Sequence, residues 1–205
     1  MDIELKNVEV YNQIATDFSD KRFSSWNWID GFLNSFEKNK TILDMGCGNG
    51  RNMTKKDLNF IGIDNCHNFI NICKKKGLSV MECDMANIPL PEKTFDGIIS
   101  IASFHHLATI DRRKQTLMEM SRMLKHNGKI LLSVWSIDQR HNNKLKFNYG
   151  DNYIPWKDNM GMIKGNRYYY IFKIDEIKFL LEQYFIIENH FWDHGNEIFI
   201  LKQLH

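Results

Sequence analysis

Short apolar runs, rich in Ile, Leu, Val and Phe, recur along this chain, and segments in which apolar residues return every three or four positions separate them. Such runs are typical of buried parallel strands, and the spaced segments are typical of helices that pack on a sheet. The alternation predicts an α/β fold with a mostly parallel sheet and helices on both faces. The expected strands lie at 41–44, 59–64, 78–82, 94–101 and 129–135.

The spaced segments predict a helix that Ser24 or Ser25 caps and that continues to Phe36, and four further helices. Those four are expected at 7–18, 66–76, 111–125 and 174–183.

Three connections are less regular. Only eight residues, 51–58, separate the first glycine-rich stretch from the second strand, so a short helix is expected there. Residues 136–170 show no clear period and are expected to be irregular; a connection of that length is usually functional or disordered. The chain is expected to end in an antiparallel hairpin with strands at 185–192 and 197–202.

Length and composition narrow the class of protein. With 205 residues, 43% of them hydrophobic, a single domain over 1–205 is expected. The net charge of +2 neither indicates nor excludes binding to nucleic acid. The polar start, Met1–Glu4, and the lack of an apolar run near the about 20 residues of a membrane span predict a cytoplasmic protein without membrane contact, with the nucleus as a second location. The four cysteines lack zinc-ligand spacing, so no metal site is expected.

The first strand runs into a glycine-rich stretch, Asp44-Met45-Gly46-Cys47-Gly48-Asn49-Gly50. Glycine lets a loop turn sharply and lets a ligand approach the main chain, and such a loop after a parallel strand lines the ligand crevice. The dinucleotide fingerprint G-x-G-x-x-G is not met, because Arg51 stands where the third glycine would be. The stretch resembles motif I of the Rossmann-like S-adenosylmethionine (SAM) methyltransferases, although three glycines can also simply form a tight turn.

Acidic residues also end the next two expected strands. Asp64 follows Asp44 by 64 − 44 = 20 residues, the separation at which an acid accepts hydrogen bonds from ribose hydroxyls. The resemblance to SAM methyltransferases implies that Asp84 and the apolar Met85 hold the adenine. It implies SAM as cofactor, S-adenosylhomocysteine (SAH) as product, and a cofactor-binding set of Asp44, Gly46, Cys47, Gly48, Gly50, Asp64, Asn65, Asp84, Met85 and Ser100.

The segment Ser100–Thr109 reads S-I-A-S-F-H-H-L-A-T, and Asp111-Arg112-Arg113 follows it. It is similar to the signature S-I-A-x-x-H-H-x-A-T-x-x-R-R of the eukaryotic tRNA wobble-uridine carboxymethyl methyltransferases, which include the methyltransferase domain of the AlkB-homologue tRNA enzyme. Further similar segments follow in the family's order at 10–22, 134–135, 154–157 and 167–169. The resemblance implies a Rossmann-like class I fold with strand order 3-2-1-4-5-7-6, a helical lid at 1–38 and a substrate-side insertion at 136–170.

The implied reaction transfers a methyl group from SAM to the carboxylate of 5-carboxymethyluridine at the anticodon wobble position, giving a methyl ester. A carboxylate is ionised at neutral pH and needs no general base, so the protein has to orient it. Arginine suits that task through its two-pronged guanidinium. The implied catalytic residues are Arg22 and Arg167 for the carboxylate, His105 or His106 as a hydrogen-bond donor, with His106 favoured, and Trp135 as a surface on which the uracil stacks. An aromatic residue at a strand end is also common in a core.

The family implies two partners. One is the tRNA anticodon loop, with Trp156 and Tyr168–Tyr170 available for stacking and Lys157, Lys164 and Arg167 for phosphates. Lys74–Lys76 are also candidates for a phosphate contact. The simpler interpretation is that this lysine run is a solvated helix end, where cations suit the helix dipole. The second partner is a small zinc-binding activator subunit that several methyltransferases share. The unpaired edge of the third strand is a candidate site for it.

Two segments depart from the family pattern. The connection between Trp135 and Pro155 is short, and the ending Gly195–Ile198 lacks the family's tryptophans. A paralogue with another substrate would also fit these departures. The sequence is also compatible with a methyltransferase for a small carboxylate or quinone-like substrate, and with a SAM-binding scaffold without catalysis.

Overall fold

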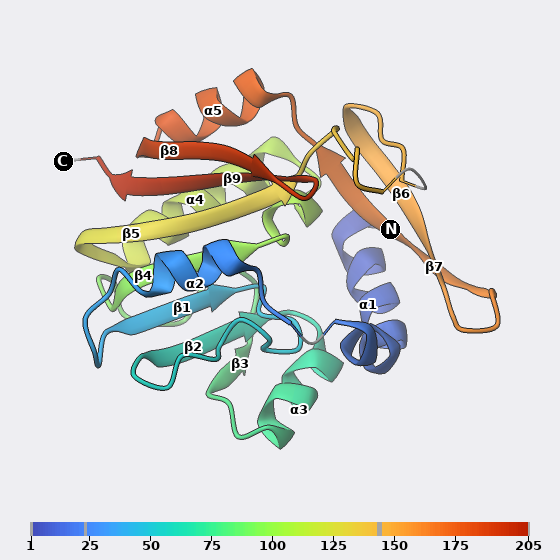
Figure 1. The fold of residues 1–205 in the computed structure, drawn as a ribbon, viewed down its shortest axis with the longest axis horizontal. Coiled ribbons are helices and arrows are strands. Elements are labelled where there is room, and N and C mark those ends of the chain that lie inside the picture. Colours follow the sequence, from blue (N-terminus) through green and yellow to red (C-terminus); the bar gives the residue numbers. More distant parts are fainter. Residues whose placement is uncertain (1, 23, 143–144, 205) are drawn as a thin grey trace.

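A seven-stranded sheet forms the body of the protein in the computed structural model, which describes residues 2–22, 24–142 and 145–204. The strand order is β3-β2-β1-β4-β5-β9-β8 (Figure 1), which confirms the predicted order 3-2-1-4-5-7-6 with a hairpin inserted before the last helix. The strands β1 to β5 run parallel, and β9 and β8 are antiparallel. Their bounds are β1 Thr41–Met45, β2 Asn59–Asp64, β3 Val80–Glu82, β4 Phe95–Ile101, β5 Leu124–Trp135, β8 Phe185–Asp193 and β9 Asn196–Gln203.

Helices cover both faces of this sheet (Figure 1). On one face, α4 (Ile110–Met123) and α5 (Ile174–Glu182) bury apolar residues in the main core. On the other face, α2 (Asn27–Leu33) buries Ile29, Phe32 and Leu33 against β1, β4 and β5. The helix α3 (His67–Lys75) packs Ile70 and Cys73 beneath the glycine-rich loop. Because the parallel strands share one direction, their carboxyl ends meet at a single edge, where a ligand crevice is expected.

The N-terminal segment differs from the expected two-helix lid. The helix α1 (Ile3–Lys21) is longer than predicted, because Asp2 caps it by accepting a hydrogen bond from the Glu4 N–H. It crosses the carboxyl edge of the sheet, whereas α2 belongs to the core of the opposite face. Neither Ser24 nor Ser25 caps α2, which begins after Trp26. Of the two helices, only α1 is therefore placed where a lid over this edge would lie.

Two connections also differ from expectation. Residues 51–58 form turns and no helix, because the chain passes directly from the glycine loop to β2. The segment expected to be irregular contains an antiparallel hairpin, β6 (Gly150–Lys157) and β7 (Ile163–Ile171), outside the main sheet. Asp158 builds its turn by accepting hydrogen bonds from the Met160 and Met162 N–H groups. The helix α1 packs between this hairpin and the sheet (Figure 1), and the Tyr168 N–H donates to Asn7.

Candidate active site

The glycine-rich loop turns back on itself directly after β1. Gly46, Gly48 and Gly50 all have positive φ angles, of 77°, 53° and 75°. The Asp64 carboxylate holds the loop by accepting hydrogen bonds from the Gly48 N–H and the Cys66 N–H, each at 2.8 Å. The second acid of the sequence pattern therefore joins the loop to the tip of β2.

At Gly46, an added side chain would clash with a neighbouring Cβ atom, which is fixed close to its own main chain. A Cβ there would lie 2.4 Å from the Cβ of Ser103, whereas a Cβ at Gly48 would meet open space. We expect Gly46→Ala to lower the free energy of unfolding by about 3 kcal/mol, since a left-handed backbone and a clash both add cost, and Gly48→Ala to lower it by about 1 kcal/mol. Urea unfolding of both variants checks this. Equal losses would show that the contact with Ser103 does not constrain the loop.

The three acids at the strand ends have different surroundings. Asp44 is fully buried, and neither carboxylate oxygen has a hydrogen-bond partner. Burial and the Asp64 charge raise the pKa of Asp44 to about 7, although Arg51 opposes this. Burial also raises the pKa of Asp64 to about 6, against the effect of its backbone donors. Asp84 is the most exposed and pairs with Arg112 at 2.7 Å.

The raised pKa of Asp44 has a consequence for stability. A carboxyl with a folded pKa of about 7 keeps its proton in the native state, so its contribution is present below pH 4 and is lost as the pH rises toward 7. The buried His105 and His106, whose pKa values are lowered, act in the opposite direction over part of this range. The effect of Asp44 is therefore isolated by the difference in unfolding free energy between the wild type and a variant that lacks only this carboxyl. From pH 5 to pH 7, we expect Asp44→Asn to gain about 2 kcal/mol of unfolding free energy relative to the wild type. A pH-independent difference would contradict a buried, unpaired Asp44.

A cleft of about 980 Å³ of empty space, part of it open to solvent, lies between this loop and α1. Of the expected cofactor residues, it is lined by Gly46, Cys47, Gly48, Asp64, Asn65, Asp84 and Met85. Asp44, Gly50 and Ser100 do not line it. Ser100 is buried and shares a hydrogen bond with the Ser103 hydroxyl, which in turn donates to the Met45 carbonyl. Ser100 thus lies behind Ser103, which lines the cleft, and the expected contact of Ser100 with the cofactor stays a prediction.

The lining residues that the sequence did not indicate come mostly from α1 and from the turns after β1 and β4. They include Glu4, Asn7, Val8, Tyr11, Phe18, Arg51, Asn52, Ala102, Ser103 and Arg112. Arg112 belongs to the motif that resembles the tRNA methyltransferase signature, so a signal for it was present. For the α1 residues, the helical period and the implied lid over 1–38 indicated a helix near the cofactor, but they did not show which of its side chains face the cleft.

The histidine pair lies on a 3-10 turn, η1 (Phe104–His106), at the tip of β4. His106 lines the cleft, and its Nδ1 donates to the Tyr168 carbonyl at 2.6 Å. Burial lowers the pKa of His106 to about 4, so Nε2 is unprotonated and accepts the Tyr11 hydroxyl at 3.0 Å. The single N–H of His106 is therefore used within the protein, and the expected donor to substrate is not available on this side chain.

His105 is the more buried of the two and does not line the cleft. Its Nδ1 accepts the Trp135 N–H at 3.0 Å, which places the proton on Nε2. That Nε2 has no hydrogen-bond partner among the described residues. Of the two histidines, the structure therefore directs only His106 toward the cleft, where it supports Tyr11.

Beyond Tyr11, a cluster of cations and rings continues the site. We call Arg22, Arg167, Trp156, Tyr169 and Phe18 the arginine–aromatic pocket. The Arg167 guanidinium lies over the rings of Trp156 and Tyr169, at 4.8 and 5.3 Å from their centroids, and Arg22 lies over Phe18 at 5.1 Å. The Tyr169 hydroxyl is 3.3 Å from that of Tyr11, which joins this pocket to the cleft.

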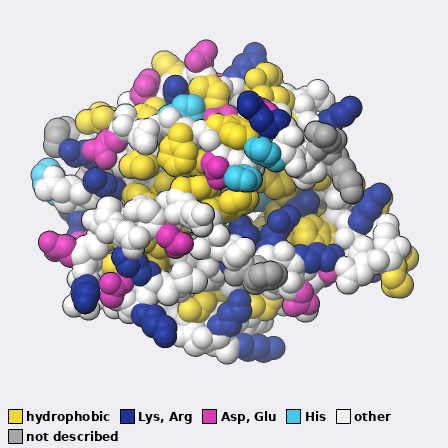
Figure 2. Space-filling model, in the orientation of Figure 1, with side chains coloured by type: hydrophobic (Ala, Val, Ile, Leu, Met, Phe, Trp, Pro, Cys, Tyr) yellow, Lys and Arg dark blue, Asp and Glu magenta, His cyan; other side chains and the backbone are white. Residues whose placement is uncertain are grey.

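Arg167 is only 5% exposed, and its Nε lacks a hydrogen-bond partner. Among residues 2–22, 24–142 and 145–204, no carboxylate lies within ion-pair distance of Arg167, Arg22 or Arg51. Lys and Arg side chains are visible beside the hollow between the sheet and the β6–β7 hairpin (Figure 2). A buried cation without an anion is costly, so this pocket is suited to an anionic ligand.

Trp135, at the end of β5, stacks on Tyr169 with ring centroids 4.2 Å apart and planes 8° apart. Phe147 lies near it at 5.4 Å. One face of Trp135 is therefore already covered, and the residue does not line the cleft. It supports the arginine–aromatic pocket from behind.

The described part of the chain offers neither a membrane span nor a metal centre. No helix in it combines the length and apolar character needed to cross a membrane. No group of three or more His, Cys, Asp or Glu side chains in the same residues is placed to bind a metal ion.

The sheet order and the glycine loop define a Rossmann-like class I methyltransferase fold. The family described as a methyltransferase domain matches residues 43–132. A Haloferax volcanii methyltransferase, solved in complex with the Trm112 methyltransferase activator, superimposes with a TM-score of 0.68 at 15% identity, over 95% of this chain and 98% of that one. At that identity the likeness concerns the fold.

Sequence relatives narrow the class. The chain is 32% identical to the tRNA (carboxymethyluridine(34)-5-O)-methyltransferase of Schizosaccharomyces pombe, over 89% of this chain and 90% of that protein. It is 38% identical to the ALKBH8 enzyme of that name from Mus musculus, over 70% of this chain but 22% of the mouse protein. The chain thus spans about a fifth of that larger relative. It belongs to the tRNA (carboxymethyluridine(34)-5-O)-methyltransferase family.

Proposed function

We propose that this protein is a SAM-dependent tRNA methyltransferase that forms the methyl ester of 5-carboxymethyluridine at the anticodon wobble position. The observation that carries the proposal is Arg167, a buried guanidinium without a carboxylate partner among the described residues, placed between two aromatic rings beside the cofactor cleft. The names of the relatives and the membership of the family support the same substrate.

The residues of the cleft fit SAM. The Asp44 carboxyl, two residues before Gly46, has no hydrogen-bond partner, and a cationic ligand bound near the glycine loop would stabilise its ionised form. Asp64 and Asp84 present acceptors for hydroxyl and amino groups, and the open space at Gly48 lets a ligand approach the main chain. Bound SAM supplies the methyl group to an oxygen nucleophile.

The protein's task is then to orient the nucleophile. A guanidinium can donate two parallel hydrogen bonds to a carboxylate and fix the direction of its oxygens. Arg167 is stacked and buried, so it is pre-organised for this, and Arg22 adds a second positive charge at the same pocket. A neutral amide in place of the carboxylate would leave the Arg167 charge uncompensated. Selection of the acid follows from that penalty.

The surface around the pocket fits a nucleic-acid loop. Lys157 is exposed on β6, while Lys164 is held by Asp158 at 3.2 Å. Trp156 and Tyr169 are buried within the pocket, and Tyr168 is buried on the opposite side of β7, whereas Tyr153 is 55% exposed and lies beside Tyr168 and α1. Of the aromatic residues on this hairpin, Tyr153 is therefore the one best placed to stack on an unpaired base.

The zinc-binding activator subunit is a second proposed partner. The strand β3 is an edge of the sheet, so its outer backbone groups are available for strand addition. The Haloferax volcanii neighbour was solved with a methyltransferase activator, which is a statement about that protein. Better solubility and activity on co-expression with an activator would support this partner, and a monodisperse, fully active lone chain would count against it.

The test is methyl transfer in vitro. The purified chain, with and without a co-expressed activator, is incubated with labelled SAM and tRNA that carries 5-carboxymethyluridine, and the nucleosides are analysed. We expect label in the methyl ester, and none with tRNA that carries the carbamoylmethyl amide. Transfer to small carboxylates with none to tRNA would favour a small-molecule methyltransferase. Binding of SAH without any transfer would favour a scaffold.

A further inference from the structure

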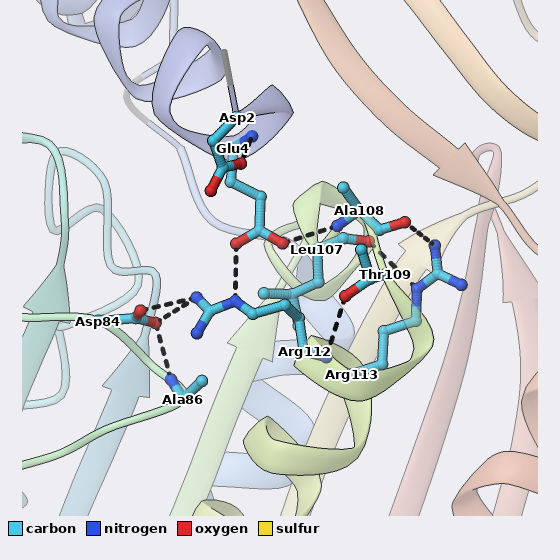
Figure 3. A network of polar contacts seen from close by, with 9 residues as sticks. All are labelled: Asp2, Glu4, Asp84, Ala86, Leu107, Ala108, Thr109, Arg112 and Arg113. Carbon is cyan, nitrogen blue, oxygen red and sulfur yellow. Dashed lines mark hydrogen bonds and ion pairs between the residues drawn. The ribbon is translucent and has the colours of Figure 1, made fainter.

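One arginine connects the lid helix to the wall of the cofactor cleft (Figure 3). Arg112, in the first turn of α4, donates from Nε to the Glu4 carboxylate at 3.0 Å and from Nη2 to both oxygens of Asp84 at 2.7 Å. Glu4 belongs to α1, and Asp84 follows β3. All three residues line the cleft.

Both carboxylates that Arg112 holds also accept a hydrogen bond from a backbone N–H. The other oxygen of Glu4 accepts the Ala108 N–H at 2.8 Å, and Asp84 accepts the Ala86 N–H at 2.9 Å. Thr109 caps α4 through the Arg112 N–H. The neighbouring Arg113 fixes the same loop by donating to the Leu107 and Ala108 carbonyls. The guanidinium is thus presented by a rigid turn and has little freedom to move.

We propose that Arg112 is a positioning residue that couples the lid helix α1 to the cofactor cleft by holding Glu4 and Asp84 at the same time. The proposal rests on the proposed function in one respect, that Asp84 contacts the cofactor. Without the guanidinium, two carboxylates would approach each other at this end of the cleft and repel. With it, closure of α1 and the orientation of Asp84 stabilise one another.

The coupling is reciprocal. A ligand that contacts both Asp84 and the inner face of α1 binds the closed helix better than an open one, so it favours closure. Loss of the Glu4 charge lowers the closed fraction of the free protein, and the apparent affinity falls by the same factor. Arginine is required in this role, because a lysine ammonium lacks the separate edges that reach two carboxylates.

The first test is Glu4→Gln, which keeps an acceptor for the Ala108 N–H and removes only the charge. Hydrogen exchange of the α1 amides is measured without ligand, and SAH affinity is measured by calorimetry. We expect exchange at least threefold faster in α1, unchanged exchange in β1 and β4, and an SAH Kd about fivefold higher. The matched control is Glu9→Gln, a residue of the same helix outside the cleft, which should leave both unchanged.

The second test separates coupling from a general loss of structure. If Glu4 acts through Arg112, Glu4→Gln should add less than about twofold to the SAH Kd of Arg112→Gln, and Arg112→Lys should fall between wild type and Arg112→Gln. Full additivity of the two substitutions would overturn the proposal, as would unchanged α1 exchange in Glu4→Gln. Because exchange is measured without cofactor, the coupling is tested even if the chain binds no SAH. If the wild type binds SAH and Glu4→Gln has the same SAH affinity and the same α1 exchange, the coupling is overturned and the proposed function stays intact.

Discussion

Replacing Arg167 by methionine is expected to abolish most esterification of tRNA while leaving the fold intact. Met fills similar space between Trp156 and Tyr169 but carries no charge, so the substrate carboxylate loses its bidentate partner. Loss of a charged hydrogen-bond pair in a buried site predicts a fall in kcat/KM of about 100-fold or more. The unfolding free energy should stay the same or rise, because the wild type buries a cation whose Nε has no partner.

Two measurements distinguish this from general damage. SAH affinity of Arg167→Met should change less than about threefold, since Arg167 does not line the cofactor cleft. Arg167→Lys keeps the charge but lacks the two-pronged guanidinium, so its activity should lie between that of the wild type and that of Arg167→Met. Esterification of tRNA at the wild-type rate would show that Arg167 does not orient the substrate. A markedly less stable variant would show that the Arg167 charge is compensated within the protein, against the premise of an uncompensated cation.

The second large effect is expected at Asp64. Asp64→Ala removes the acceptor for the Gly48 and Cys66 N–H groups and, in the proposed complex, for the ribose. The glycine loop then loses its tie to β2. Together these losses predict an SAH Kd about 100-fold higher, which calorimetry measures directly.

The matched control for Asp64 is Asp30→Ala, an exposed acid on α2, far from the cofactor cleft in the fold. It should bind SAH like the wild type. Asp64→Asn, which can still accept one of the two hydrogen bonds, should bind more tightly than Asp64→Ala. Equal affinity of Asp64→Ala and wild type would show that this acid serves the loop without serving the ligand.

The strands of the sheet were predictable from local signals, and their order was implied by the resemblance to the methyltransferase family. Apolar runs marked β1 to β5, and the acids Asp44, Asp64 and Asp84 at or just after the ends of the first three marked the shared edge. The terminal hairpin was predicted as well, since Gly195 marks the turn between alternating segments. These features depend on residues that are close together in the chain.

The details of the site were not predictable in the same way. The tautomer of His106 depends on Tyr11 and on the Tyr168 carbonyl, which are 95 and 62 residues away. The hairpin of β6 and β7 lacked a clear period, because Arg167, Tyr168 and Tyr169 are consecutive and all buried. One side faces the pocket and the other faces α1, so no alternation of polar and apolar residues marks this strand. The roles proposed for Arg22 and Arg167 stay predictions.

Esterification of the wobble carboxymethyl group of tRNA is the activity on which every other inference about this chain depends. Nucleoside mass spectrometry of tRNA from cells that lack the chain measures it in the natural substrate. We expect loss of the 5-carboxymethyluridine methyl ester and accumulation of the free acid, with both restored by the wild-type chain but not by Arg167→Met. An unchanged level of methyl ester in tRNA from those cells would contradict the proposed activity.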